Sequence, residues 1–557
     1  MRNILLPTII LILAALACDL ETTREPIPPG PPPTLPVVLT SSGATFASGD
    51  QTIIHTDNLK NSSGNWAAFG QAPSKAGLST NQGTLQVEFN IAANTAATAI
   101  RGLIDLPAPA NGVTLTLQAH DRTLNLLIGV NEADKSWYHT FLRLDPDSGA
   151  RTYTIDFSWL RLNQDSEDEN NHLDLEQVSE LTIADLSGFI GPVGPGTLEI
   201  HNLSFWQGNA EPQTQCSSDQ TAPDGFLVGV DANFIPDGED SGENWYVGDT
   251  PVDPLALLAE QGAQALRLRI WVGDQGVSKL DYATDLALRA HENGMQVHPV
   301  LFLSPDWSDV NSQPAPEEWQ DLTLEERAIA INKYANATVQ RLLETGVRVP
   351  YYAVGNEIDF GISGIFAELE QRDRGTLQST IWPQSADLIK AAIEGIRQAD
   401  PGAQILLQVA ISYDPAFALT FFQSMRDLGV EFDIAGLSFY PSAFGPLVVS
   451  GFCETIDRLG TELGLPVVIP EFGYPAQIPA GGPFASWYND LPGYPLTQDG
   501  QARWIADFFA SLRQHPNVIG AYYFSPAFHW GGDIWGAFAL FDQDGRARQG
   551  IGALSPP

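Results

Sequence analysis

Hydrophobic residues follow two different periods in two parts of this chain. Between residues 38 and 207, short segments such as 84–89, 124–128 and 152–157 alternate apolar with polar residues, and Gly, Asn, Asp and Pro residues separate them. A period of two is typical of half-buried β-strands, and short strands at close intervals are typical of a sandwich. We therefore predict an all-β, jelly-roll-like sandwich over residues 38–207.

From residue 225 to 557, short apolar runs alternate with longer segments of helical periodicity. The predicted strands are Phe226–Phe234, Ala265–Val272, Gln296–Leu303, Pro350–Glu357, Gln404–Ala410, Asp433–Pro441, Pro466–Glu471 and Val518–Pro526. The predicted helices include Pro254–Gln261, Tyr282–Asn293, Leu324–Glu344, Ser385–Gln398, Ala416–Leu428, Gly451–Leu463 and Gln501–Gln514. Eight strands that alternate with helices predict an α/β fold, the (β/α)8 or TIM barrel, so the chain is multidomain.

The first 37 residues differ in composition from both predicted domains. Residues 1–18 carry one Arg and then an apolar run that ends at Cys18, which predicts a signal peptide. The sequence from Ala15 to Cys18 resembles a bacterial lipobox, which would make Cys18 the lipidated N-terminus; the alternative is a cysteine beside an ordinary cleavage site. Residues 19–37 are rich in proline and residues 208–224 are polar, so we predict a linker at each.

The formal net charge of −39 results from 28 Lys and Arg against 67 Asp and Glu. Such a surface repels nucleic acid phosphates and anionic lipids, so we expect neither as a partner. A neutral polysaccharide is a compatible partner, and a membrane is expected only through the lipid anchor on Cys18. We expect a monomer that is extracellular, either secreted or held at the cell surface as a lipoprotein. Nothing in the sequence calls for a redox or nucleotide cofactor.

Two further cysteines, Cys216 and Cys453, lie beyond Cys18. They could form a disulfide in an oxidising compartment. Because Cys453 lies in a segment of helical periodicity, the interpretation that we favour is a small buried hydrophobic residue.

An acidic run within the predicted sandwich is a candidate calcium site, because carboxylate and amide oxygens are calcium ligands. Its members are Asp165, Glu167, Asp168, Glu169, Asn170 and Asp174. The run lacks the glycine and the terminal bidentate glutamate of a recognisable calcium loop, so a solvated charge run is favoured. Calcium stays open as a cofactor, and we assign no metal ligands.

Two glutamates stand at the carboxyl ends of predicted barrel strands. Glu357 follows Asn356 at the end of the fourth strand, and Glu471 ends the seventh. Active sites of (β/α)8 barrels lie at that face, so the two carboxyl groups are expected to meet across one cleft. A pair of carboxylic acids is what retaining glycoside hydrolysis requires, one to protonate the leaving oxygen and one to attack the anomeric carbon.

Six segments, in order along the chain, resemble glycoside hydrolase family 53, the arabinogalactan endo-β-1,4-galactanases. They are 229–231 (GVD), 267–272 (RLRIWV), 307–309 (WSD) with Gln313 and Trp319, 355–358 (GNEI), 433–441 (DIAGLSFYP) and 470–475 (PEFGYP). The resemblance spans Gly229 to Gly545. It implies a retaining endo-β-1,4-galactanase that hydrolyses galactan or arabinogalactan side chains by double displacement with two glutamates.

The same resemblance implies a role for each site residue. Glu357 would be the general acid/base, with a pKa raised by burial and by the second carboxylate, and Glu471 would be the nucleophile. Arg267 and Tyr440 would donate the hydrogen bonds that keep Glu471 ionised, and Asn356 would bind the substrate 2-hydroxyl. The implied substrate-binding residues are Asp231, Arg267, Arg269, Trp271, Trp307, Asn356 and Tyr440. The aromatic residues that could stack on sugars or pack in the core are Trp271, Trp307, Trp319, Tyr440, Trp530 and Trp535.

Three segments depart from the pattern of that family. Residues 302–306 (FLSPD) replace a His-Tyr-Ser-Asp run, Gln408 replaces a histidine, and residues 523–528 (YFSPAF) replace Tyr-Trp-Glu-Pro-Ala-Trp. Two alternatives to a galactanase therefore stay open. One is a retaining glycosidase that acts on another β-glycan, such as mannan or β-glucan, and the other is a non-catalytic glycan-binding surface protein.

The end of the predicted sandwich, 198–206 (LEIHNLSFW), resembles the last strand of jelly-roll carbohydrate-binding modules attached to glycanases. Trp137, Tyr138 or Trp159 could stack on sugar rings, but an aromatic residue in a sandwich strand is more often part of the core. A carbohydrate-binding module is therefore one interpretation of residues 38–207, and we assign sugar binding to none of these aromatic residues.

Overall fold

The structure is a computed structural model that describes residues 50–59, 65–81, 83–164, 166–216, 225–274, 276–530 and 535–555. The predicted signal peptide, Cys18, the linker at 19–37 and Asp165 lie outside these residues, so the predictions made for them stay untested. Among the helices of the described part, none combines the length and the apolar character needed to cross a bilayer.

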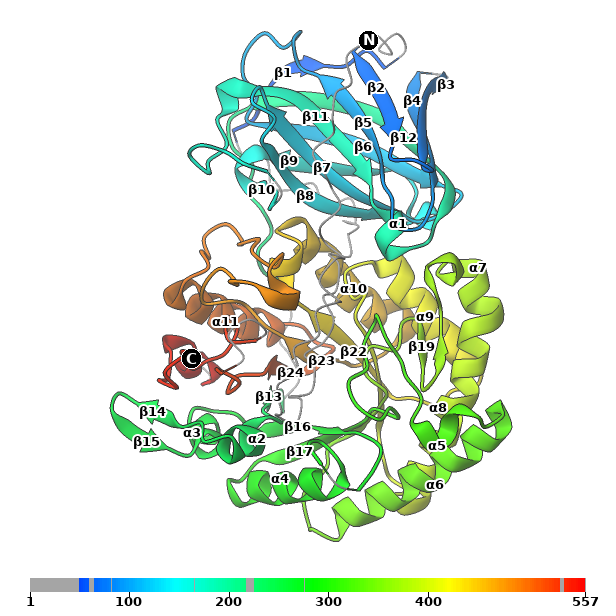
Figure 1. Cartoon of the computed structure of the whole chain (residues 1–557), viewed down its shortest axis with the longest axis vertical. Helices are drawn as coiled ribbons and strands as arrows, with labels where there is room; N and C mark the ends of the chain where they lie inside the picture. Colours follow the sequence, from blue (N-terminus) through cyan, green and yellow to red (C-terminus); the bar gives the residue numbers. More distant parts are fainter. Residues whose placement is uncertain are drawn as a thin grey trace, which may run out of the picture.

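Two antiparallel sheets form the N-terminal part of the described chain, which confirms the predicted β-sandwich (Figure 1). One sheet has the order β3-β4-β12-β6-β9 with β1 paired to β12, and the other has the order β10-β8-β7-β11-β5-β2. The strands are β1 (Thr52–Thr56), β2 (Trp66–Gly70), β3 (Lys75–Asn81), β4 (Thr84–Ile91), β5 (Ala97–Gly102), β6 (Gly112–His120), β7 (Leu124–Glu132), β8 (Trp137–Leu144), β9 (Arg151–Asp156), β10 (Arg161–Leu162), β11 (Val178–Asp185) and β12 (Gly194–Gln207). Short helical turns join them: η2 (Pro146–Ser148), η3 (Phe157–Trp159), η4 (Leu175–Gln177) and α1 (Ser187–Ile190).

Strand β6 shows how the alternating sequence produces the sandwich core. Val113, Leu115 and Leu117 are fully buried, whereas Thr114 and Thr116 between them are half-buried on the outer face. Full burial of each aliphatic side chain contributes about 1.5–3 kcal/mol. A one-residue slip of the strand would exchange the two faces, so the hydrophobic pattern fixes the register.

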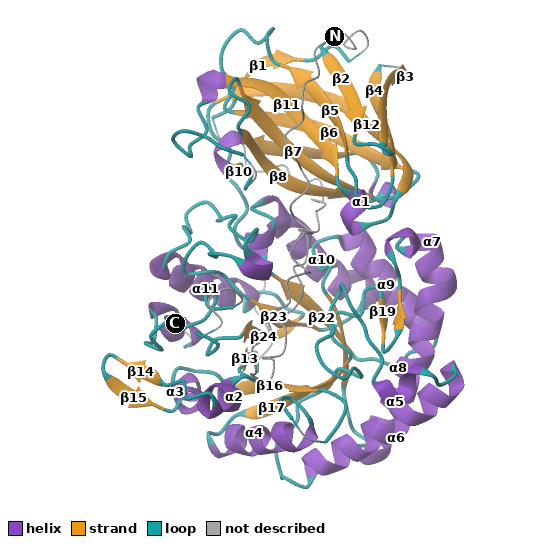
Figure 2. Cartoon of the chain, viewed as in Figure 1, coloured by secondary structure: helices purple, strands orange, loops and turns teal. Residues whose placement is uncertain are grey.

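The C-terminal part of the described chain is a closed barrel of parallel strands, as predicted, with helices around it (Figure 2). Its strands, in barrel order, are β13 (Leu227–Asp231), β16 (Ala265–Ile270), β17 (Gln296–Leu301), β18 (Tyr352–Val354), β21 (Ile405–Val409), β22 (Ile434–Phe439), β23 (Val467–Phe472) and β24 (Val518–Phe524). The predicted helices are present as α3 (Pro254–Glu260), α4 (Leu280–Glu292), α6 (Leu324–Leu343), α8 (Trp382–Ala399), α9 (Pro415–Asp427), α10 (Leu447–Leu463) and α11 (Gln498–Leu512).

Several short elements between the barrel strands, and one after the last of them, were not predicted. They are α2 (Ile235–Asp240), β14 (Trp245–Val247), β15 (Thr250–Val252), α5 (Glu317–Gln320), β19 (Gly361–Ile362), β20 (Ile365–Phe366), η5 (Leu369–Gln371), α7 (Arg374–Thr376), η6 (Leu377–Ile381), η7 (Pro441–Ala443), η8 (Gly482–Phe484) and η9 (Gln549–Leu554). They are too short to show a hydrophobic period, which is why the sequence pattern does not reveal them.

The fourth barrel strand is shorter than predicted. We expected Pro350–Glu357, but β18 ends at Val354. Beyond it, Gly355 has φ 75° and Glu357 has φ 48°, both in the left-handed region. A non-glycine residue in this region is uncommon, and such positions concentrate at functional sites. The backbone therefore turns out of the strand at the predicted catalytic glutamate.

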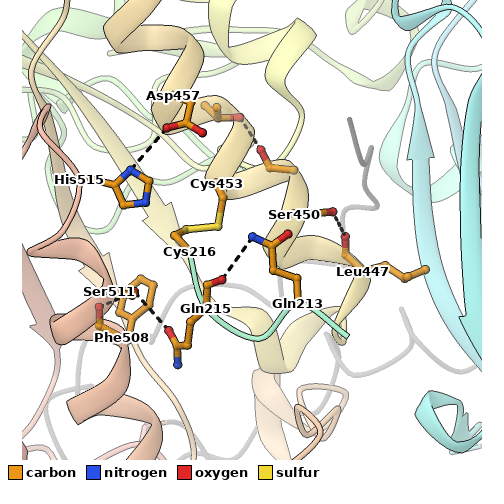
Figure 3. The surroundings of a disulfide bond; sticks show 12 residues. Gln213, Gln215, Cys216, Leu447, Ser450, Cys453, Asp457, Phe508, Ser511 and His515 are labelled. Carbon is orange, nitrogen blue, oxygen red and sulfur yellow. Dashed lines mark hydrogen bonds and ion pairs between the residues drawn. A yellow bond between two sulfur atoms is a disulfide. The ribbon is translucent and has the colours of Figure 1, made fainter. Parts of the chain in front are cut away.

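The interpretation of Cys453 as an unbonded buried residue is wrong, because it forms a disulfide with Cys216 (Figure 3). Cys453 lies on α10, and Cys216 lies beyond the last sandwich strand, 237 positions earlier in the sequence. Helical periodicity predicts that Cys453 is buried, but it does not predict which residue bonds to its sulfur. The bond ties the segment that leaves the sandwich to a barrel helix. Disulfides persist mainly in oxidising compartments.

The sandwich packs directly against the barrel. Leu447, the first residue of α10, belongs to the hydrophobic core of the sandwich. Arg374 forms an ion pair with Asp145, and Arg151 Nη1 lies 3.3 Å from Glu454 Oε2 on α10. Figure 1 shows β8 and β10 on the side of the sandwich that faces the barrel. The two domains are therefore in direct contact.

Two of the three aromatic residues considered for sugar stacking in the sandwich lie in its core. Tyr138 and Trp159 are buried, whereas Trp137 is half-buried and packs against His139, with 5.0 Å between ring centroids. The core interpretation is thus confirmed for Tyr138 and Trp159.

The predicted acidic run lies near two other carboxylates of the sandwich. Asp168 accepts a 2.6 Å hydrogen bond from Tyr138 Oη. A carboxylate oxygen from each of Asp168, Glu132 and Asp134 can be chosen so that all three lie within 4.8 Å of one another. Calcium binding by the acidic run stays open beside the favoured interpretation, a solvated charge run.

Candidate active site

Glu357 and Glu471 line the same cleft at the carboxyl ends of the barrel strands. Glu357 follows β18, the fourth strand of the barrel, and Glu471 lies near the end of β23, the seventh. The space among the side chains that line the cleft, open solvent included, is about 570 Å³. The closed barrel thus brings together two carboxyl groups that are far apart in the sequence.

Two side chains donate hydrogen bonds to the carboxylate of Glu471, and a third forms an ion pair with it. Tyr440 Oη donates to Oε2 at 3.0 Å, and Gln408 Nε2 donates to Oε1 at 3.3 Å. Arg267 Nη2 lies 2.9 Å from Oε1 as the ion-pair partner. The contact of Tyr440 agrees with the predicted donor, whereas Arg267 acts through its charge. Together the three side chains stabilise the ionised carboxylate.

Arg267 is fully buried beneath the cleft, and side chains from other barrel strands hold its guanidinium. Nη1 donates to Asp231 Oδ2 at 2.6 Å. Nη2 donates to Asn356 Oδ1 at 2.6 Å and to Gln408 Oε1 at 2.9 Å. Gln408, which stands where the resemblance predicts a histidine, therefore bonds both Arg267 and Glu471. Gln408 in place of the histidine therefore still provides a hydrogen-bond donor to the Glu471 carboxylate.

Other predicted substrate-binding residues lie behind the cleft lining. The Asn356 side chain accepts from Arg267, and its Nδ2 donates to the Ser308 carbonyl at 2.9 Å. Arg269 is fully buried, and its Cζ lies 4.4 Å from the ring centroid of Trp307, which does line the cleft. Trp271 is buried in the barrel core. Asp231, Arg267, Arg269, Trp271 and Asn356 are thus not among the residues that line the cleft.

Burial raises the pKa of Glu357 well above its usual value, and the negative charges of Glu471 and Asp309 raise it further. Asp309 also lines the cleft, and burial raises its own pKa to about 6. The Val310 N–H lies 3.5 Å from Glu357 Oε2, so it is a weak donor. This environment favours the protonated carboxyl, which is the form that a general acid needs.

Burial also raises the pKa of Glu471, but the positive charge of Arg267 opposes the effect. Hydrogen bonds from Tyr440 and Gln408 act in the same direction as Arg267. The two carboxyls therefore differ: Glu357 is the better proton carrier, and Glu471 is the better anion. A pair of titratable groups whose environments separate their pKa values can divide acid and nucleophile roles between them.

Aromatic side chains form the walls of the cleft. They are Trp307, Tyr413, Tyr440, Phe444, Phe484, Trp487 and Trp535. The Tyr440 ring lies 5.1 Å from Trp487 and 5.9 Å from Trp535, centroid to centroid. Such flat apolar faces can stack on pyranose rings while the carboxyl groups stay at the base of the cleft.

Of the aromatic residues named from the sequence as candidates for stacking, Trp307, Tyr440 and Trp535 line the cleft. The others pack elsewhere: Trp271, Trp319 and Trp530. Sequence reasoning missed Tyr413, Phe444, Phe484 and Trp487, which lie in loops that carry no hydrophobic period. A signal was available for the last two, because the segment between β23 and α11 is long, and long loops at this face of a barrel are usually functional.

Comparison with known proteins identifies relatives of the barrel. The family model described as "Glycosyl hydrolase family 53" matches residues 227–554. An uncharacterized protein in the bgaB 5' region of Niallia circulans is 29% identical over 347 residues, which cover 59% of this chain and 93% of that protein. Arabinogalactan endo-beta-1,4-galactanase A of Emericella nidulans is 26% identical over 307 residues, which cover 54% of this chain and 84% of that protein.

Two solved structures share the barrel fold. A structure of fungal beta-1,4-galactanases matches with a TM-score of 0.51 at 21% identity, over 59% of this chain and 98% of that chain. The GH53 catalytic domain of Ignisphaera aggregans matches with a TM-score of 0.52 at 24% identity, over 60% of this chain and 96% of that chain. At these identities the likeness shows the fold. The match to the family model begins only after the last sandwich strand.

Proposed function

The chain belongs to glycosyl hydrolase family 53, and from this premise we propose that it is a retaining endo-β-1,4-galactanase that hydrolyses galactan or arabinogalactan. The observation that carries the proposal is the shared cleft in which Glu357 and Glu471 have different environments. Glu357 is the proposed acid/base and Glu471 the proposed nucleophile. The aromatic walls supply stacking surfaces for a neutral sugar chain.

In the first step, the Glu471 carboxylate attacks the anomeric carbon and the bond to the leaving sugar breaks. Glu357 transfers its proton to the glycosidic oxygen, so the leaving sugar departs as an alcohol. Arg267 on strand β16 and Tyr440, the residue directly after β22, hold the attacking carboxylate. The product is a glycosyl ester on Glu471 and an ionised Glu357.

In the second step, Glu357 must act as a base. The negative charge of Glu471 is one of the causes that raise the pKa of Glu357, and this charge disappears when Glu471 becomes an ester. The pKa of Glu357 then falls, so its ionised form can take a proton from water. The water attacks the anomeric carbon, the ester bond breaks, and both carboxyl groups return to their first states.

A second candidate, a retaining glycosidase acting on another β-glycan, is favoured by one specific observation. Phe302 and Leu303 occupy the place of a polar run that the resemblance predicts, and both are fully buried. They therefore cannot provide the polar substrate contacts of that run. Relatives are named as arabinogalactan endo-beta-1,4-galactanases, which favours galactan over mannan or β-glucan for this chain.

The test is an assay of the purified chain on galactan, arabinogalactan, mannan and β-glucan, with NMR of the anomeric configuration of the first product. We expect galactan and arabinogalactan to be cleaved, with the β-configuration released first, since two displacements restore the starting configuration. If only mannan or β-glucan is cleaved, the assigned substrate changes from galactan to that glycan. Binding without cleavage of any glycan would refute the enzyme assignment and favour a glycan-binding surface protein.

A further inference from the structure

Two loops that carry cleft-lining residues also contact the β-sandwich. One is residues 410–414 after β21, which contributes Ala410 and Tyr413 to the cleft, and the other is residues 482–490 after β23, which contributes Phe484 and Trp487. Loops of this kind are usually the most mobile part of a barrel, because few of their backbone groups are fixed by regular structure. What holds them therefore affects the shape of the cleft.

Strand β10 of the sandwich holds the loop at 482–490. Arg161 Nε donates to Asp490 Oδ1 at 2.6 Å, and Tyr488 Oη donates to the Leu162 carbonyl at 2.8 Å. Next to this strand, Gln164 Nε2 donates to the Ala485 carbonyl. Phe484 and Trp487 lie in the same short segment as these anchors.

Strand β8 of the sandwich holds the loop at 410–414. Arg143 Nε donates to Asp414 Oδ2 at 2.7 Å, and both side chains are almost fully buried. Asp414 also caps α9 by accepting from the Phe417 N–H, and the Arg143 guanidinium lies 5.5 Å from the Phe417 ring centroid. Arg143 Nη1 donates to Asn125 Oδ1 on β7, so the sandwich fixes the guanidinium from its other side.

We propose that Arg143 and Arg161 are positioning residues of the substrate cleft, through which the β-sandwich holds the two loops that carry Tyr413, Phe484 and Trp487. The proposal rests on the proposed function in one respect, namely that the cleft binds a glycan. Aromatic walls that are ordered before the sugar arrives bind it more tightly, because binding then loses less conformational entropy. The sandwich thus contributes to the binding of any glycan that enters the cleft, whether or not it binds glycans on its own surface.

The proposal separates binding from chemistry. Glu471 lies within a barrel strand and Glu357 three positions after one, and neither belongs to the two loops, so loosening the sandwich contacts leaves the reacting groups in place. Loosening the loop at 482–490 removes stacking surfaces from the bound glycan in the ground state and in the transition state alike. Such a loss of uniform binding raises KM and leaves kcat unchanged.

Arg161→Ala is the test variant, because its ion pair with Asp490 is about one quarter exposed and its loss should not unfold the chain. The matched control is Arg151→Ala, which removes another ion pair between the sandwich and the barrel, to Glu454 on α10. Kinetics are measured on whichever β-glycan the wild-type chain cleaves. We expect Arg161→Ala to raise KM about fivefold with kcat within about twofold, equivalent to about 1 kcal/mol of binding at 1.4 kcal/mol per factor of ten. For Arg151→Ala both parameters should stay within about twofold of wild type.

Two further variants test whether the ion pair itself acts. Arg161→Glu should raise KM more than Arg161→Ala, since it places two negative charges side by side. Combining Arg161→Glu with Asp490→Arg should restore most of the wild-type KM, which a merely structural role of Arg161 would not produce. Failure of this repair, or a wild-type KM in Arg161→Ala, would overturn the proposal.

Hydrogen exchange of residues 482–490 tests the same inference without any substrate. Exchange there should be faster in Arg161→Ala than in wild type and unchanged in Arg151→Ala. Unchanged exchange in Arg161→Ala would refute the positioning role even if galactan is cleaved. Faster exchange together with an inert wild-type chain would support the positioning of the loop and refute the proposed function, so the two failures are distinguishable.

Discussion

Replacing Glu357 and Glu471 separately with alanine tests the role of each carboxyl group. Loss of a general acid lowers the rate by about 10²–10⁴-fold, or about 2.7–5.5 kcal/mol at 1.36 kcal/mol per factor of ten. Asp309 lines the same cleft and has a pKa raised by burial to about 6. It is a second proton source below that pH, so we expect Glu357→Ala to lose least in acid and most above about pH 6.

Glu471→Ala should lose more activity than Glu357→Ala at every pH. The attacking group itself is gone, and Arg267, Tyr440 and Gln408 lose the carboxylate that they contact. Both variants should fold, because each side chain lines the cleft and belongs to no packed core. Glu431→Ala, at an exposed position on the barrel surface, is the control and should match wild-type kinetics.

Azide added to each alanine variant identifies the role of the missing carboxyl group. The substrate is the dinitrophenyl glycoside of the cleaved glycan, whose leaving group needs no proton. In Glu357→Ala the ester on Glu471 forms, and azide should displace it to give a β-glycosyl azide. In Glu471→Ala azide should take the place of the nucleophile and give an α-glycosyl azide. NMR distinguishes the two products, and the opposite pair of products would mean that the two roles are exchanged.

Three further predictions concern pH and stability. The plot of kcat/KM against pH should be bell-shaped, because activity falls in acid as Glu471 becomes protonated and in alkali as Glu357 loses its proton. Asp309→Asn removes a negative charge that raises the pKa of Glu357. The alkaline side of the plot should therefore move to lower pH in this variant. An unmoved alkaline side would contradict the electrostatic argument. Arg143→Met should lower the free energy of unfolding by about 3–5 kcal/mol in chemical denaturation, because it leaves the buried Asp414 carboxylate without its cation. A decrease below about 1 kcal/mol would show that the ion pair is not buried in solution. Cys453→Ala should lower the free energy of unfolding by about 2–5 kcal/mol, and the stability of this variant should not change when reductant is added. A wild-type chain that is equally stable with and without reductant would argue against the disulfide.

Much of the barrel follows from the sequence because its signals are local. Each buried strand is a short apolar run, and each helix repeats its apolar positions over several turns. Placing Glu357 and Glu471 at the ends of the fourth and seventh strands then needs no further information, since parallel strands in a closed barrel present their carboxyl ends at one face. Arg267 and Tyr440 could be named as partners of Glu471 because the resemblance covers the segments that carry them, whereas Gln408 could not.

The sequence could not give the interactions that depend on distant partners. Cys453 has the periodicity of a buried residue whether or not Cys216 meets it. Phe484 and Trp487 lie in a loop without a period, and their place in the cleft depends on how that loop folds back. Gln408 looked like the loss of a functional histidine, yet in the structure it bonds both Arg267 and Glu471.

By itself, the sequence determined the two domains, the order of strands and helices, and the pair of glutamates at the strand ends. These features depend on hydrophobic periods that can be recognised within one segment without knowledge of its partners. The tertiary structure alone decided which aromatic residues form the cleft walls, that the two cysteines are bonded, and that the sandwich reaches the loops of the barrel. These features join segments that are hundreds of residues apart in the sequence. A local hydrophobic pattern predicts which residues of one segment are buried, but it does not predict which distant segment packs against them.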